Sequence, residues 1–132
     1  TQLQHVAAIG GIMQRVLDPL MDEMAGLPYH GKLKRLATYV DEMRKKQQAA
    51  VQYVAEKKDS TYYDLVTKHL VDMETYVFVS YLMLRDALKD SEREIFAERY
   101  VLDAVPEFDR SYAVVTSGDV TLIDNYRELL DY

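Results

Sequence analysis

The sequence predicts an all-α protein, an up-down-up-down four-helix bundle with a short additional C-terminal helix. Apolar residues recur at steps of three and four over long stretches, which is the period of one helix face. No segment shows the strict apolar–polar alternation of a half-buried strand. Short connections separate the long helical stretches, and such connections favour antiparallel neighbours.

The first predicted helix ends near residue 25, before the turn-forming Gly-Leu-Pro-Tyr-His-Gly of residues 26–31. Pro19 lies inside it and is expected to bend it, because proline removes a backbone donor. The apolar stripe begins at Leu3 with no preceding loop. We therefore expect a fragment of a longer protein, in which residues 1–25 continue from an upstream domain and residues 26–132 are the remainder of a single helical-bundle domain.

Three further helices follow. The second, over about residues 32–57, has a predicted buried stripe of Leu33, Leu36, Val40, Met43, Gln47, Ala50 and Val54. The third, over about residues 62–89, is expected to be capped by Thr61-x-x-Asp64, and the fourth by the capping box Ser91-x-x-Glu94. The fourth stripe is Val101, Val105, Phe108, Tyr112 and Val115, with a kink expected at Pro106. Residues 117–119 then separate it from a short last helix.

The third helix is apolar nearly all round between residues 76 and 84, whereas a bundle helix needs only one buried stripe. Two interpretations stay open: this helix is the most enclosed of the bundle, or its outer face packs on another domain or subunit. Tyrosines slightly favour the second, because a phenol suits a site that is apolar at one end and wet at the other. The candidate interface residues are Tyr76, Phe78, Tyr81 and Leu82.

Composition excludes several classes of function. The chain has no cysteine, so disulfides, zinc–thiolate sites and thiol nucleophiles are absent, and a reducing cytoplasmic setting is the expectation. A formal net charge of −6 disfavours nucleic acid and anionic lipid. No apolar run approaches the roughly 20 residues of a membrane span.

Site chemistry is mostly absent from the sequence. A di-iron bundle needs Glu-x-x-His pairs, but the residues three before the histidines are Val66, Leu27 and Gln2. His69 and Asp72 share a helix face, and a solvated or capping pair explains them better than metal ligation. No Gly-x-Ser-x-Gly elbow and no phosphate-cradling loop occurs. We therefore predict no catalytic residue and no metal site in this chain.

Two segments carry a family resemblance. Thr1-Gln2-Leu3-Gln4 resembles the end of the motif Tyr-Glu-Gly-Thr-(Ser/Thr)-Gln-(Ile/Leu)-Gln of flavin-dependent acyl-CoA dehydrogenases, although His5 follows where many members have a basic residue. The rest is similar to the helical C-terminal extension of a bacterial subset of these enzymes. Its best-matching parts are the aromatic third helix, Phe96-Ala97-Glu98-Arg99-Tyr100 and Val105-Pro106-Glu107.

The resemblance implies a parent enzyme that binds FAD and oxidises an acyl-CoA to the 2,3-enoyl-CoA in fatty-acid oxidation, passing electrons to an electron-transfer flavoprotein. The bundle would be a non-catalytic accessory and assembly domain that packs on the missing upstream catalytic domains or on a second subunit. Thr1, Gln2 and Leu3 would be a remnant of the flavin site, active only in the intact parent. No cofactor is expected for the isolated fragment.

Two alternatives remain open from the sequence. One is a free-standing helical bundle for protein–protein interaction, which would need a partner able to cover the third helix. The other is a metal- or haem-binding bundle, in which some of the six methionines would be ligands rather than core residues.

Overall fold

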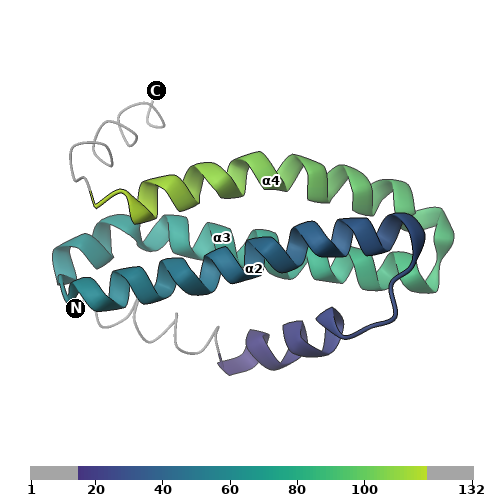
Figure 1. The fold of residues 1–132 in the computed structure, drawn as a ribbon, viewed down its shortest axis with the longest axis horizontal. Helices are drawn as coiled ribbons and strands as arrows, with labels where there is room; N and C mark the ends of the chain where they lie inside the picture. Colours follow the sequence, from purple (N-terminus) through teal and green to yellow (C-terminus); the bar gives the residue numbers. More distant parts are fainter. Residues whose placement is uncertain (1–14, 119–132) are drawn as a thin grey trace.

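The computed structural model describes residues 15–118, and this part of the chain is an all-α bundle, as predicted (Figure 1). Its helices are residues 15–25, α2 (Gly31–Lys57), α3 (Ser60–Lys89) and α4 (Glu94–Thr116), with the 3₁₀ turn η1 (Ser91–Arg93) leading into α4. Residues 15–118 contain no strand. The predicted short last helix lies outside the described residues.

Successive helices run antiparallel, which confirms the up-down-up-down order (Figure 1). α2 and α3 lie side by side in the middle of the bundle, and α4 packs on both of them. Residues 15–25 lie along the other side of the α2/α3 pair, opposite α4 (Figure 1). α2 and α3 therefore both contact α4 and residues 15–25 as well as each other.

Two predicted caps are wrong, and an aspartate just upstream explains each error. The Asp59 carboxylate accepts hydrogen bonds from the backbone N–H groups of Thr61 and Tyr62, at 3.0 and 3.2 Å, so α3 begins two residues before its predicted start. Asp90, not Ser91, caps the next turn by accepting from the Glu92 backbone N–H at 3.1 Å. An aspartate at the cap also places negative charge at the positive end of the helix dipole.

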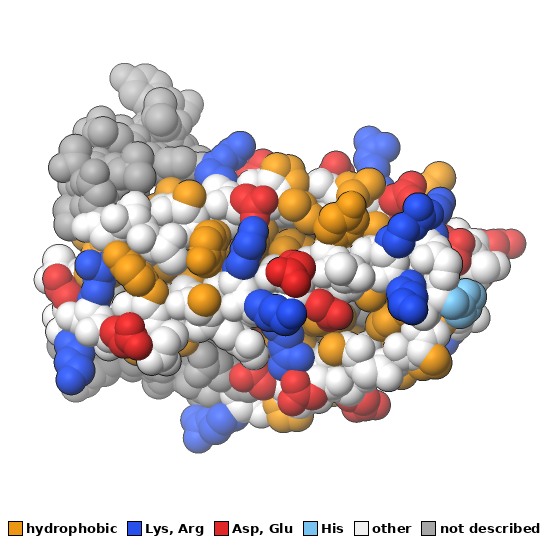
Figure 2. Space-filling view, viewed as in Figure 1, with side chains coloured by type: hydrophobic (Ala, Val, Ile, Leu, Met, Phe, Trp, Pro, Cys, Tyr) orange, Lys and Arg blue, Asp and Glu red, His pale blue; other side chains and the backbone are white. Residues whose placement is uncertain are grey.

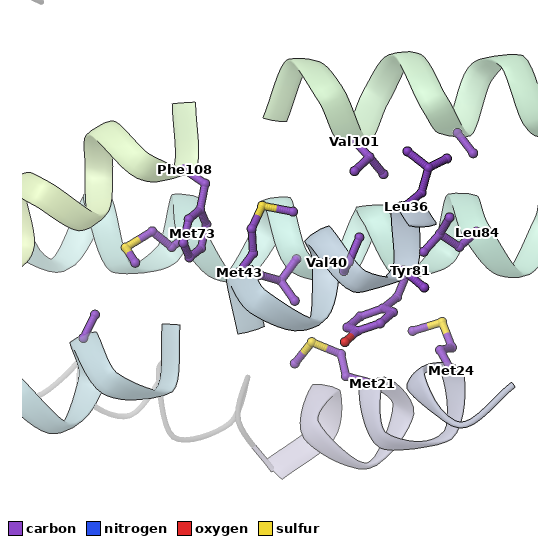
Figure 3. Close-up of a cluster of buried hydrophobic side chains, with 14 of the residues drawn as sticks. Met21, Met24, Leu36, Val40, Met43, Met73, Tyr81, Leu84, Val101 and Phe108 are labelled. Carbon is purple, nitrogen blue, oxygen red and sulfur yellow. The ribbon is translucent and has the colours of Figure 1, made fainter. Parts of the chain in front are cut away.

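The core runs along the seam where α2, α3 and α4 meet (Figure 3). All seven residues of the predicted α2 stripe are buried, which confirms that prediction. In α4 the buried face is rotated relative to the prediction: Ala104 and Ser111 are buried, while Val105 and Tyr112 are half-buried. Small residues at those two positions let α4 approach α3 closely. The helix continues without interruption through Pro106.

The end of α4 is tied to the start of α3 by Tyr62. Its buried hydroxyl donates a hydrogen bond to the Val115 carbonyl oxygen and accepts one from the Gly118 backbone N–H at 3.1 Å. Gly118 has a φ of 68°, and a Cβ there would lie 2.7 Å from the hydroxyl oxygen of Tyr53. Glycine suits this position, because it has no Cβ to strain the positive φ or to meet the Tyr53 hydroxyl.

None of the helices in residues 15–118 combines the length and the hydropathy needed to cross a membrane.

Candidate functional site

The apolar segment 76–84 of α3 has no exposed residue. Some of its residues face the core, and the others lie on the two sides of the helix that flank the core-facing side, called here its flanks. Val77, Ser80 and Leu84 face the core and are fully buried. Of the four predicted interface residues, Tyr76, Phe78 and Leu82 are half-buried, whereas Tyr81 is 1% exposed. The structure therefore does not bring the four together as one outer surface.

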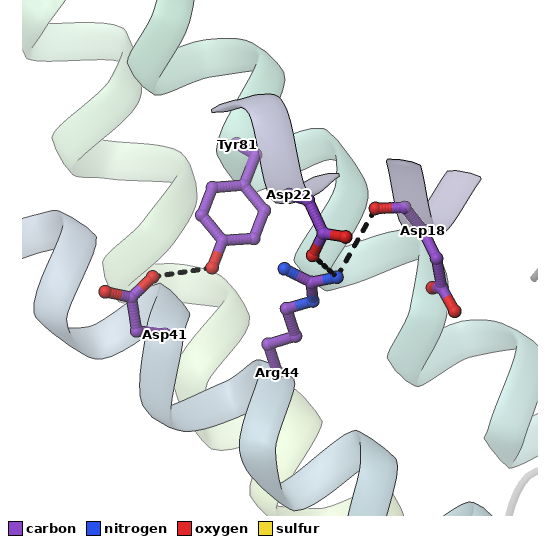
Figure 4. A network of polar contacts seen from close by, with 5 residues as sticks. All are labelled: Asp18, Asp22, Asp41, Arg44 and Tyr81. Carbon is purple, nitrogen blue, oxygen red and sulfur yellow. Dashed lines mark hydrogen bonds and ion pairs between the residues drawn. The ribbon is translucent and has the colours of Figure 1, made fainter. Parts of the chain in front are cut away.

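Tyr81 is covered by residues 15–25 of the same chain. Met21 and Met24 lie against its ring (Figure 3), and its hydroxyl donates a 2.6 Å hydrogen bond to Asp41 Oδ1 on α2 (Figure 4). Burial, and then the Asp41 carboxylate, raise the pKa of Tyr81. We expected Tyr81 to face a partner outside the bundle; in the structure it is a core residue of the bundle itself.

Arg44 holds residues 15–25 against α2. One guanidinium nitrogen donates to Asp22 Oδ1 at 2.6 Å and to the Asp18 carbonyl oxygen at 3.4 Å (Figure 4). Nearby, the buried Glu74 of α3 accepts a 3.1 Å hydrogen bond from the Gln47 side-chain amide. Burial is the main cause that raises the pKa of Glu74, and Asp18 adds to it. This flank of α3 is thus closed by a helix with both apolar and polar contacts.

The opposite flank of α3 is open. A hollow of about 430 Å³ lies between α3 and α4, with Tyr76 and Met83 on one wall and Phe96, Tyr100 and Ala104 on the other. A second hollow of about 500 Å³ shares Met83 and Phe96 with the first and extends to η1. Because they share two side chains, we treat them as one groove, called here the α3/α4 groove.

The floor of the α3/α4 groove is apolar and its rim is acidic. Two arginines, Arg93 and Arg99, stand against five carboxylates, which gives the rim a formal charge of 2 − 5 = −3. Arg93 lies 3.5 Å from Asp90, and Arg99 lies 3.5 Å from Asp103, so both arginines already have acidic partners. Of the other three rim carboxylates, Asp86 lies 3.8 Å from Arg85 and Glu107 lies 3.1 Å from Arg110, and the third is Glu92. With Arg85 and Arg110 included, the formal charge around the groove is 4 − 5 = −1.

Exposed apolar residues gather on the N-terminal half of α4. Phe96, on the groove, is 63% exposed, and Ile95 and Leu102 are 66% and 50% exposed. Ile95 and Leu102 share the other side of α4 with Glu98, which pairs with Lys32 of α2 at 3.3 Å. Over α2 and α4, charged side chains of both signs are mixed, with hydrophobic ones reaching the surface between them (Figure 2).

The other described residues considered in the sequence analysis lie apart from the groove. His69 is buried, with Nδ1 3.3 Å from Ser111 Oγ on α4, so it is not the solvated residue that we expected. Within residues 15–118, no group of three or more histidines and carboxylates is placed to hold a metal ion. Met43 is a core residue, as predicted, and Met24 and Met73 are core residues as well. Thr1, Gln2 and Leu3 lie outside the described residues.

Sequence reasoning found Tyr76 but missed the opposite wall of the groove. Phe96 and Tyr100 are four residues apart and therefore lie on one side of α4. This aromatic pair on an otherwise charged helix surface was a usable signal for an interaction surface. In the sequence analysis these residues serve only as part of the family resemblance.

Comparison with known families agrees with this architecture. The family model described as acyl-CoA dehydrogenase C terminal matches residues 17–120. The chain belongs to this family. No curated protein and no solved structure shows a significant match. The matched range contains α2, α3 and α4 and nearly all of residues 15–25, so the acyl-CoA dehydrogenase C-terminal domain is the bundle itself. The Thr1-Gln2-Leu3-Gln4 segment precedes the matched range.

Proposed function

We propose that this acyl-CoA dehydrogenase C-terminal domain is a non-catalytic accessory and assembly domain, which packs on the catalytic domains of the same protein or on a second subunit. The observation that carries the proposal is the α3/α4 groove, an apolar surface in which Phe96, shared by both hollows, is 63% exposed. Large exposed apolar surfaces on soluble domains mark interaction sites. Family membership supplies the enzyme to which the surface belongs.

In this proposal the parent enzyme binds FAD, oxidises an acyl-CoA to its 2,3-enoyl-CoA in fatty-acid oxidation, and passes electrons to an electron-transfer flavoprotein in the cytoplasm. Family membership supports these assignments, and the bundle contributes assembly rather than chemistry. Within residues 15–118, its groove offers no free basic cluster for the phosphates of coenzyme A, because the arginines around it are paired with carboxylates. A protein surface with an apolar centre fits the groove better.

The proposal also assigns Thr1, Gln2 and Leu3 to the flavin site of the intact parent alone. The isolated 132-residue chain should then bind no flavin tightly. Purification in the presence of excess FAD, followed by desalting and a visible absorption spectrum, tests this. A yellow protein with one flavin per chain would contradict the assignment.

Truncation of the full-length gene product tests the accessory role. A version that ends at residue 14 lacks the bundle and should lose its native oligomeric mass in light scattering, or unfold at a lower temperature, compared with the intact enzyme. Flavin content and acyl-CoA-dependent reduction of an artificial electron acceptor report on the catalytic domains separately. A truncated enzyme with an unchanged number of subunits, unfolding temperature and activity would refute the proposal.

A further inference from the structure

We propose that the α3/α4 groove is the docking surface of this domain, and that its occupant is an amphipathic helix of the catalytic part of the same dehydrogenase, with an apolar ridge flanked by lysine or arginine. This inference rests on the proposed function and adds the surface and the chemistry of the partner. Three observations support it: the shape of the groove, the way in which the other flank of α3 is filled, and the charge of the rim.

The closed flank of α3 shows what kind of element fits the open one. There, a helix formed by residues 15–25 places Met21 and Met24 on the ring of Tyr81 (Figure 3). The open flank presents the same residue types, Tyr76 and Met83, and it runs between two helices. An amphipathic helix that lays its apolar side chains into a hydrophobic groove is a recurring mode of recognition.

The charge of the rim indicates which of the possible binding partners fits the groove. The formal charge around the groove, −1 with Arg85 and Arg110 included, favours a cationic partner over an anionic lipid surface. A second copy of this bundle would present the same acidic rim. Residues 119–132 carry four carboxylates and one arginine, a formal charge of 1 − 4 = −3. Both alternatives bring like charges together, so a basic helix from another part of the enzyme is the better fit.

Phe96 is the expected anchor of the interface. It is a large aromatic side chain, 63% exposed, placed where the two hollows of the groove meet. Aromatic residues of this kind dominate binding energy at the centre of interfaces. Its neighbour Ile95 is equally exposed, on the same turn of α4, but does not line the groove, which makes it the matched control.

Photo-crosslinking in the intact full-length enzyme tests the assignment. A benzoylphenylalanine is placed at position 96 or, as the control, at position 95, and the crosslinked peptides are sequenced. Position 96 should capture a helix of the catalytic part that contains apolar residues next to lysine or arginine, and position 95 should capture it much less. Capture of a second bundle, capture of residues 119–132, or no crosslink at position 96 would each overturn the assignment.

Hydrogen exchange of the same enzyme provides an independent readout. Phe96→Asp should raise amide exchange in η1 and the first turns of α4 about tenfold, whereas Ile95→Asp should change it less than about twofold. Glu92→Lys, at the rim, should act in the same direction as Phe96→Asp, and more weakly at high salt. Equal behaviour of the two aspartate variants would overturn the groove assignment.

The two proposals fail in different ways. If truncation before residue 15 leaves the number of subunits, the stability and the activity unchanged, the accessory function itself is wrong. If truncation disrupts the enzyme while positions 96 and 95 behave alike, the accessory function stands and the docking surface lies elsewhere on the bundle.

Discussion

The two flanks of α3 have similar side chains and different surroundings. On the closed flank, Tyr81 lies under Met21 and Met24, and its hydroxyl is bonded to Asp41. On the open flank, Tyr76 and Met83 line a groove, and the Tyr76 hydroxyl makes no hydrogen bond within residues 15–118. Burial raises the pKa of both tyrosines. For Tyr81 alone, a direct hydrogen bond to a carboxylate raises the pKa further.

This contrast shows that apolar character does not decide whether a helix face is core or interface. Both flanks carry a tyrosine and contact a methionine. One is core because the chain itself supplies a covering helix, and the other is a surface because the described chain does not. The comparison can be tested with matched pairs of substitutions, one on each flank.

The largest expected difference is between two methionines. Met21→Ala removes a side chain that is 1% exposed, and should lower the free energy of unfolding by about 2–4 kcal/mol through lost burial and a residual cavity. Met83→Ala, in the half-open groove, should cost less than about 1 kcal/mol. Urea unfolding of the 132-residue chain, followed by circular dichroism, measures both. Equal decreases in the free energy of unfolding would mean that the two flanks are not different environments.

The next pair of substitutions removes one tyrosine hydroxyl from each flank of α3. Tyr81→Phe breaks the hydrogen bond to Asp41 and should cost about 1–2 kcal/mol, because the acceptor is charged and half-buried. Tyr76→Phe loses no hydrogen bond within the described chain, so its cost should be close to zero. The same urea titrations apply. A larger cost for Tyr76→Phe than for Tyr81→Phe would reverse the assignment of the two flanks.

The smallest effect concerns Glu74, on the closed flank. Its folded-state pKa is raised by burial, so the folded chain binds more protons than the unfolded chain above about pH 4. The carboxyl therefore costs stability as the pH rises through its folded pKa. Glu74→Gln should match the parent chain near pH 4 and be more stable by about 1 kcal/mol or less at neutral pH.

A pH series of unfolding curves for the two proteins checks this prediction, because the difference between them isolates Glu74 from the other titrating groups. Asp72→Asn is the matched control, since Asp72 is on the same helix and is only half-buried. A Glu74→Gln variant that is less stable than the parent at neutral pH would show that the carboxylate is favourably paired when folded, against the direction of its pKa.

Much of the fold could be predicted because its signals are local. All seven residues of the predicted α2 stripe are buried, since most are apolar and they recur at a clear helical period; only the small Ala37 was missed. The buried face of α4 was displaced because Ala104 and Ser111 are small and give a weak hydrophobic signal. The caps were assigned one or two residues late, because Asp59 and Asp90 offer the same chemistry just upstream of the predicted residues.

The candidate site was less predictable, since it depends on how two helices lie beside each other. Tyr76 was found from the unbroken apolar run in α3, but Met83, Phe96 and Tyr100 become its neighbours only when α3 and α4 pack. Tyr81 was misplaced for the same reason. Nothing local in α3 shows that residues 15–25, more than fifty positions away, cover one flank and leave the other open.

The Tyr62 hydroxyl has a consequence for folding cooperativity. It joins the first turn of α3 to the last turn of α4, across 53 positions to Val115 and 56 to Gly118. Helix ends ordinarily fray independently and at low cost. Here neither end can open without breaking bonds at the other, so the two termini of these helices should unfold as one unit, and that end of the bundle should be its slowest to open.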